Sequence, residues 1–239
     1  MRMLLMDRSS PNPGMAVCED GRKICGFVWE GAPTGSPAWM ADVRNALRDA
    51  GVAPASLDLF VCGLGPGSFS GIRACLSALT GLALPGGKPV AGVASAEGIA
   101  LDYAVASGRE RITVIGDARR ERLWIVNYAV DAASGRVRLL DGRVPTQTAL
   151  DFRLVTSEEL SAAVPPETTV LSPDATRLAP VLGRHFPPER LGSPSPVYPS
   201  IDGLCRIAFA DRDACRKDPQ PIYLQAAVAE KKPGTEGTA

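Results

Sequence analysis

The chain has 239 residues, of which 45% are hydrophobic and 22% are charged, as is usual for a globular protein. Its 26 lysines and arginines balance 26 aspartates and glutamates, so the formal net charge is zero. A protein that grips nucleic acid by itself usually carries a basic excess, because it must neutralise phosphates. The composition therefore disfavours both a disordered chain and an independent nucleic-acid binder.

The chain has one histidine, His185, and six cysteines without a C-x-x-C pair. One imidazole excludes a histidine pair on a metal ion and leaves one candidate for a histidine-based triad. His185 falls in a loop-like stretch, 183–188, and is expected to be an ordinary surface residue. With a single histidine we expect no metal site in the chain. Because no apolar run is long enough for a signal peptide or a membrane span, we expect reduced thiols and a cytoplasmic protein.

The first part of the chain predicts the order βββαβαβα. Asp20-Gly21 marks a hairpin between the second and third strands. Ser36 is a suitable N-cap for the first helix, and Gly51 is a suitable end for it. The predicted strands cover 3–7, 15–18, 23–29, 57–62 and 89–93. Helices are predicted at 36–50 and 95–106, and the segment 63–73 opens a further helix that runs to about residue 84.

After Ser107-Gly108 the order of three strands restarts. Strands are predicted at 112–115, 122–128 and 137–140, a short helix after the capping box Thr156-x-x-Glu159, and a helix at 201–215, while the proline-rich segment 164–199 gives no assignment. We therefore expect an α/β protein made of two ribonuclease-H-like units. The predicted units are residues 1–107 and 108–229, followed by a flexible tail at 230–239.

A glycine-rich loop lies between a predicted strand and a predicted helix. Gly65, Gly67 and Gly71 permit backbone shapes that expose N–H groups at the positive end of a helix dipole, where anions bind. The loop lacks the lysine of a phosphate-binding P-loop, and Ser68 replaces a glycine of the dinucleotide fingerprint. Two interpretations stay open: an anion site, with Arg73 as a partner, or the favoured one, a tight turn that packs the helix onto the sheet.

The run Gly65-Pro66-Gly67-Ser68-Phe69-Ser70-Gly71-Ile72-Arg73 resembles the G-P-G-S-F-T-G-[IV]-R signature of the TsaB/YeaZ family. The first strand ends in Asp7, as in that family, and Asp117-Ala118-Arg119 matches its D-A-R motif. Near the end, Pro221-Ile222-Tyr223-Leu224 resembles its P-[VI]-Y-L-R motif, with Gln225 in place of arginine. The resemblance therefore spans most of the chain.

This resemblance implies the actin/Hsp70/sugar-kinase (ASKHA) fold, which consists of two ribonuclease-H-like units. It implies a non-catalytic scaffold that forms a heterodimer with TsaD, the enzyme that transfers a threonylcarbamoyl group to N6 of adenosine 37 in tRNAs reading ANN codons. The ATPase TsaE would join the complex, and tRNA would be met through it. We expect no cofactor in the chain itself, with ATP or ADP at the partner interface. A homodimer of this chain is the alternative to the heterodimer.

Two regions depart from the family pattern. The first loop reads Asp7-Arg8-Ser9-Ser10 where the family has D-T-[SA]-T, and the first helix lacks the family's H-S/T-x-x-L pattern. That helix carries an apolar stripe of Met40, Val43 and Leu47, with Trp39 beside it. The resemblance implies that this helix contacts TsaD, so the stripe is either core or a partner interface.

A small-molecule kinase or ATPase of the same fold is the alternative function. It would need two glycine-rich phosphate loops, each led by an acid that holds hydrated Mg²⁺. Asp7 and Asp117 are such acids, but no glycine follows either of them closely, so both are predicted to be vestigial. A peptidase is disfavoured by the single histidine. Arg119 and Arg120 are expected on a solvated strand edge, with tRNA contact as the less favoured alternative.

Overall fold

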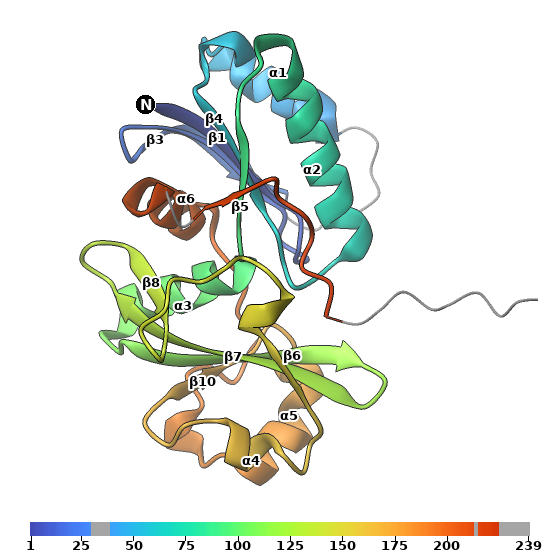
Figure 1. The fold of residues 1–239 in the computed structure, drawn as a ribbon, viewed down its shortest axis with the longest axis vertical. Helices are drawn as coiled ribbons and strands as arrows, with labels where there is room; N and C mark the ends of the chain where they lie inside the picture. The colour runs from blue at the N-terminus through green and yellow to red at the C-terminus, as the bar shows by residue number, and fades with distance from the viewer. Residues whose placement is uncertain (30–38, 213–214, 225–239) are drawn as a thin grey trace, which may run out of the picture.

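The computed structural model describes residues 1–29, 39–212 and 215–224. It contains two β-sheets, one above the other along the long axis, each with helices on both faces (Figure 1). None of the helices in these ranges is long and apolar enough to cross a membrane.

The first sheet contains the predicted hairpin of β2 and β3. Asp20 and Gly21 have φ angles of 47° and 78°, as a tight turn between β2 and β3 requires. β1 pairs antiparallel with β2 and parallel with β4, and β4 pairs parallel with β5. The elements are β1 (Arg2–Asp7), β2 (Gly14–Glu19), β3 (Arg22–Val28), α1 (Trp39–Asp49), η1 (Pro54–Ser56), β4 (Leu59–Gly63), α2 (Phe69–Ala83), η2 (Leu84–Gly86), β5 (Val90–Val93) and α3 (Ser95–Ser107).

The second sheet repeats this arrangement. β6, β7 and β8 are antiparallel neighbours, and β10 runs parallel to β6, as β4 does to β1. The prediction of two ribonuclease-H-like units in the ASKHA fold is confirmed. The elements that follow α3 in the chain are β6 (Arg111–Arg119), β7 (Arg122–Asp131), β8 (Arg136–Leu139), η3 (Ala149–Asp151), β9 (Arg153–Val155), α4 (Leu160–Ala163), β10 (Thr169–Leu171), α5 (Ala175–His185), η4 (Pro188–Arg190), α6 (Ile201–Ala210) and β11 (Arg216–Lys217).

Some boundaries differ from the sequence prediction. The proline-rich segment contains β10 and α5, and α5 includes Pro180, a residue that usually interrupts a helix. His185 is the last residue of α5 and does not lie in a loop. The helix predicted to reach residue 215 ends at Ala210. The predicted N-cap Ser36 and the tail at 230–239 lie outside the described residues.

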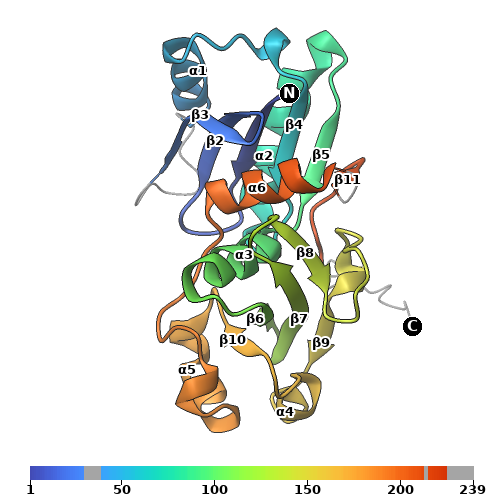
Figure 2. The same ribbon diagram turned by 90° about the vertical axis from the view of Figure 1, so that its left-hand side faces the viewer.

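The end of the chain returns to the first sheet. β11 pairs antiparallel with β5 at the edge of that sheet, and the sheet order is β11-β5-β4-β1-β2-β3. α6 covers the face opposite α1 and α2, where it packs on β2, β1 and β5 (Figure 2). The division into 1–107 and 108–229 stays a prediction. α6 and β11, which both follow residue 200, pack on or pair with strands of the first sheet.

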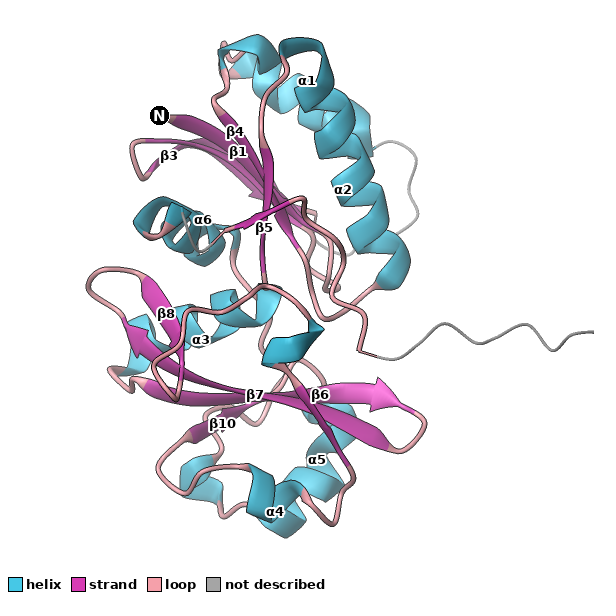
Figure 3. Ribbon diagram, viewed as in Figure 1, coloured by secondary structure: helices cyan, strands magenta, loops and turns pink. Residues whose placement is uncertain are grey.

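α3 and α6 form the layer between the two sheets (Figure 3). α3 is apolar around most of its circumference, as expected of a helix that packs on α6 above and on β6 and β7 below. The carboxylate of Asp102 accepts hydrogen bonds from the backbone N and the Oγ of Ser200, at 2.7 and 2.8 Å. These bonds join the middle of α3 to the N-cap of α6.

A buried carboxyl group lies in this middle layer. Glu97 of α3 is 1% exposed and accepts one hydrogen bond from Gln147 Nε2, at 2.7 Å. The amide of Gln147 also accepts from the backbone N of Ala94, immediately before α3. Burial raises the pKa of Glu97 from 4.5 to about 8, despite the opposing effect of the Gln147 hydrogen bond.

Glu97 therefore makes stability depend on pH. The folded protein keeps a proton that the unfolded chain releases above pH 4.5, so the stabilisation is complete below pH 4.5 and is lost as the pH rises through about 8. Thermal unfolding between pH 5 and 9 should show a falling Tm for the wild type and a flatter profile for Glu97→Gln. Each kcal/mol corresponds to about 2–4 °C. The exposed control Glu189→Gln should keep the wild-type slope; an equal slope in Glu97→Gln would contradict the assignment.

Candidate functional site

The signature loop, residues 64–68, connects β4 to α2. Ser68 is the N-cap of α2, and its Oγ accepts a hydrogen bond from the backbone N of Gly71 at 3.2 Å. Gly65 has a φ of 87°, a conformation that favours glycine, and is joined to Pro66 by a cis peptide bond. The loop thus takes the strand-to-helix position that the sequence predicted.

The first loop, residues 8–13 between β1 and β2, packs directly on the signature loop. The backbone N of Ser68 donates to the carbonyl of Ser9 at 2.7 Å. A Cβ on Gly67 would lie 2.2 Å from that carbonyl oxygen, and one on Gly71 would lie 2.2 Å from the carbonyl oxygen of Arg8. The two glycines therefore allow the chain's own backbone to approach. This geometry corresponds to the tight-turn interpretation, since the space beside them holds protein backbone.

Asp7 lies at the centre of this contact. Its Oδ1 accepts from the backbone N of Ser9 at 2.6 Å, and its Oδ2 accepts from Ser95 Oγ at 2.5 Å. Ser95 Oγ in turn accepts from the backbone N of Gly65 at 2.9 Å. Burial raises the pKa of Asp7, while the hydrogen bonds from Ser95 and Ser9 act in the opposite direction. Both carboxylate oxygens of Asp7 are therefore engaged within the fold.

Asp117, near the end of β6, is engaged in a similar way. Its Oδ1 accepts from the backbone N of Arg119 at 2.6 Å, and its Oδ2 pairs with Arg177 Nε at 3.1 Å. Its backbone N donates to Asp174 Oδ2 at 2.9 Å. Residues 119–121 form the turn to β7 with φ angles of 66°, 51° and 59°. Bulky residues, not glycines, therefore shape the hairpin at the position of the second phosphate loop of a kinase.

The apolar stripe on α1 is divided between core and surface. Val43 and Leu47 are 1% and 3% exposed and belong to the core of the first unit. Trp39 and Met40 are half-buried, and Trp39 packs on the Arg8 guanidinium, 4.4 Å from the ring centroid. Of the two interpretations left open for this stripe, Val43 and Leu47 fit the core.

The two departures from the family pattern meet at this point. Arg8 belongs to the altered first loop and Trp39 to the altered first helix, and the guanidinium of Arg8 also lies 5.8 Å from the ring centroid of Trp29. Arg8 is 3% exposed, and burial lowers its pKa. The aromatic rings therefore accommodate a cation that the first loop places inside the protein.

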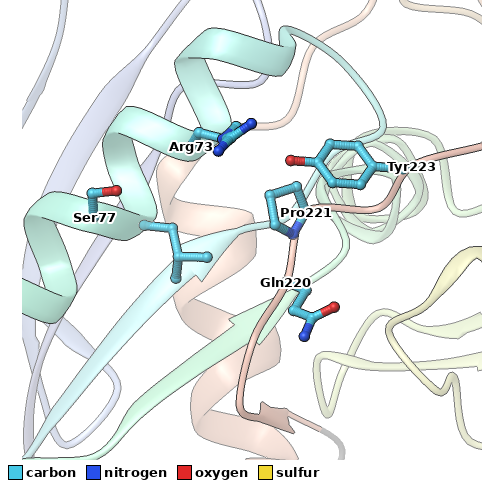
Figure 4. Close-up of a pocket in the computed structure, with 6 residues that line it drawn as sticks. Arg73, Ser77, Gln220, Pro221 and Tyr223 are labelled. Atoms are coloured by element: carbon cyan, nitrogen blue, oxygen red, sulfur yellow. The ribbon is translucent and has the colours of Figure 1, made fainter. Parts of the chain in front are cut away.

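A hollow that sequence reasoning missed joins the signature to the late motif. It has a volume of about 290 Å³ and is lined by Arg73, Leu76, Ser77, Gln220, Pro221 and Tyr223 (Figure 4). The backbone N of Ile222 donates to the carbonyl of Leu64 at 3.0 Å, which holds the late motif beside the signature loop. Both motifs belong to the resemblance to the TsaB/YeaZ family. That resemblance is the signal in the sequence that could have suggested a common site.

The remaining reactive groups are His185 and the six cysteines, of which Cys18 contacts Cys205 and Cys62 contacts Cys75. His185 Nδ1 lies 2.8 Å from Ser161 Oγ, and His185 Nε2 lies 3.4 Å from Ser157 Oγ. All six cysteines are free, and five of them are buried. Within the described ranges no three histidine, cysteine, aspartate or glutamate side chains gather as a ligand set for a metal ion.

Known proteins resemble this chain in both sequence and structure. The family model for TsaD, tRNA N6-adenosine threonylcarbamoyltransferase, matches residues 37–141. The tRNA threonylcarbamoyladenosine biosynthesis protein TsaB of Bacillus subtilis (strain 168) is 29% identical over 153 residues, which are 63% of this chain. The match spans 62% of that relative's own length.

The solved structures support the same fold over nearly the full length. YeaZ from Pseudomonas aeruginosa superposes with a TM-score of 0.71 and 22% identity, over 93% of this chain and 99% of that chain. A second structure, described as an uncharacterized protein with similarity to peptidase YEAZ from Pseudomonas aeruginosa, gives the same TM-score of 0.71 over 94% of this chain. At this level of identity the likeness shows the fold.

The packing of the two loops can be tested with glycine substitutions. Gly67→Ala should destabilise the protein by about 1–3 kcal/mol, because its methyl group would collide with the Ser9 carbonyl. Gly81→Ala is the matched control, since Gly81 lies on the exposed face of α2 with nothing within 4 Å of a new Cβ. It should be neutral or stabilise by about 0.5–1 kcal/mol. Urea unfolding gives both values, and equal stability of the two variants would contradict the packing.

Proposed function

We propose that the chain, which is similar to TsaB in sequence and to YeaZ in fold, is a non-catalytic subunit of tRNA threonylcarbamoyladenosine biosynthesis. In this proposal it pairs with a TsaD-type transferase and a TsaE-type ATPase and meets tRNA through their complex. The observation that carries the non-catalytic role is the contact between the first loop and the signature loop, where backbone fills the space beside the glycines.

The engagement of both acids supports the same role. In a kinase of this fold the two acids would hold hydrated Mg²⁺ beside glycine-rich phosphate loops. Here Asp7 is bound by Ser9 and Ser95, and Asp117 is paired with Arg177. A nucleotide bound between the units would have to break these contacts, so we assign no nucleotide or metal site to the chain itself and leave ATP or ADP to a partner interface.

The outward face of α2 is suited to a helical partner. Small side chains along its middle allow another backbone to approach closely, and large apolar side chains, 56% exposed Phe69 and 76% exposed Leu84, stand at its two ends. Since Val43 and Leu47 of α1 are used by the core, we assign the main partner contact to α2. Its exposed residues are Phe69, Ser70, Arg73, Ala74, Ser77, Thr80 and Gly81, with Leu84 immediately after the helix.

Reconstitution tests the proposal. TsaD- and TsaE-type proteins from the same organism are incubated with unmodified tRNA, threonine, bicarbonate and ATP, together with the enzyme that supplies threonylcarbamoyl-adenylate. Addition of this chain should raise N6-threonylcarbamoyladenosine formation at least about tenfold, and the chain alone should form none. Mass spectrometry of digested tRNA measures the product. Equal product with and without the chain would refute the proposal.

Nucleotide binding by the isolated chain separates this role from a kinase. Calorimetric titration with Mg²⁺–ATP should show no saturable binding at micromolar concentrations, because both acids are engaged by their own chain. Saturable binding that disappears in Asp117→Asn would favour the kinase alternative. The conservative substitution retains the volume of Asp117, and circular dichroism checks that the variant is folded.

A further inference from the structure

Arg73 is the one charged residue of α2, whose sequence is FSGIRACLSALTGLA. Its guanidinium lies 5.1 Å from the centroid of the Phe69 ring, and Phe69 contacts Tyr223 with ring centroids 5.0 Å apart. Within residues 1–29, 39–212 and 215–224, Arg73 takes part in no salt bridge. The exposed ring of Phe69 thus contacts both the Arg73 guanidinium and the exposed ring of Tyr223, beside the hollow that Arg73 and Tyr223 line.

The lining of the hollow is complementary to a single negative charge. Besides Arg73 it offers neutral hydrogen-bonding groups on Ser77, Gln220 and Tyr223, and apolar surface on Leu76 and Pro221, but no carboxylate. A guanidinium presents two parallel N–H groups that match the two oxygens of a carboxylate. The aromatic rings would shield such a pair from water once a partner covers them.

The number of cations favours a carboxylate over a nucleic-acid backbone. A phosphate chain is held by several lysines or arginines together, whereas the hollow has one. Arginine next to tyrosine and phenylalanine is instead the composition of the energetic centre of protein interfaces. The lining therefore fits an acidic side chain of a protein better than a phosphate chain.

A second copy of this chain would not supply that acid through the same helices. α2 contains no aspartate or glutamate, so a symmetric pairing of α2 with α2 leaves both Arg73 side chains unmatched. On neighbouring α1, Asp42 already accepts from Trp29 Nε1 at 2.9 Å, and Asp49 pairs with Arg48 at 2.9 Å. Charge complementarity thus points to a different protein.

We propose that the Arg73 hollow binds an aspartate or glutamate side chain of the TsaD-type partner, and that this ion pair selects a heterologous partner for α2 over a second copy. The inference rests on the proposed function, because it deepens the description of the same docking face. It adds the chemistry of the contact, which is one carboxylate held by the Arg73 guanidinium next to the rings of Phe69 and Tyr223.

The test measures the affinity of the two full-length proteins for each other. Arg73→Ala should weaken the complex about 30-fold or more, as expected when one member of a desolvated charge pair is removed. Arg73→Lys keeps the charge but loses the two-pronged geometry, so it should also bind more weakly than the wild type. Arg184→Ala, an exposed arginine on α5, is the matched control and should bind as the wild type does.

Charge reversal identifies the acid. Arg73→Glu should abolish binding at micromolar concentrations, and one acid-to-arginine variant among the partner's exposed carboxylates should restore it. Since Arg73 is exposed, thermal unfolding of its variants should match the wild type. Wild-type affinity in Arg73→Ala and Arg73→Glu would overturn the ion pair while leaving the proposed function intact.

Other results distinguish the remaining occupants. If the wild-type chain neither binds nor activates the partner, the proposed function itself fails. If Arg73→Ala leaves the affinity between the proteins unchanged but weakens binding of the complex to tRNA, the ligand is a phosphate and the inference is wrong. If Arg73→Ala instead dissociates a homodimer of the isolated chain, measured by sedimentation, the occupant is a second copy and the inference is equally wrong.

Discussion

The hydrogen bonds that converge on the Asp7 carboxylate hold the first unit together at the place where its strands end. Ser9, Ser95 and, through Ser95, Gly65 all depend on this one side chain. The contact fixes the first loop against the signature loop and sets the starting points of α2 and α3. Because the acid is buried, a loss of these donors would leave a carboxylate without compensation, which is costly in a protein interior. Gly67 and Gly71 make this arrangement possible, because a side chain at either position would collide with the backbone of the first loop.

Much of the fold was accessible from the sequence because its signals are local. The Asp20-Gly21 turn and the alternation of strands and helices predicted the first unit with small errors at the boundaries. The second unit was less clear because β10 has only three residues and Pro180 within α5 resembles a helix breaker. The predicted site residues are brought together in part: the signature loop meets Asp7, while Asp117 lies in a separate network with Asp174 and Arg177.

The rest of the site depends on contacts between distant residues. Periodicity placed Val43 and Leu47 on one face of a helix, but what that face contacts was decided by the packing of β3 and the core. The meeting of Arg8 with Trp39, and of Arg73 with Tyr223, likewise joins segments with no local signal in common. Arg8 belongs to one departure from the family pattern and Trp39 to the other, and these two side chains are in contact.

Because α6 and β11 contact the first sheet, the first unit contains residues from both before and after the second unit in the sequence. The chain leaves the first unit after α3 and comes back at Ser200, and the hydrogen bonds of Ser200 to Asp102 place the exit beside the entrance. The intervening segment is therefore an insertion into a continuous first unit. A change in the length of its outer loops would leave the α2 face in place, because α2 and the residues that line the hollow all lie outside this segment.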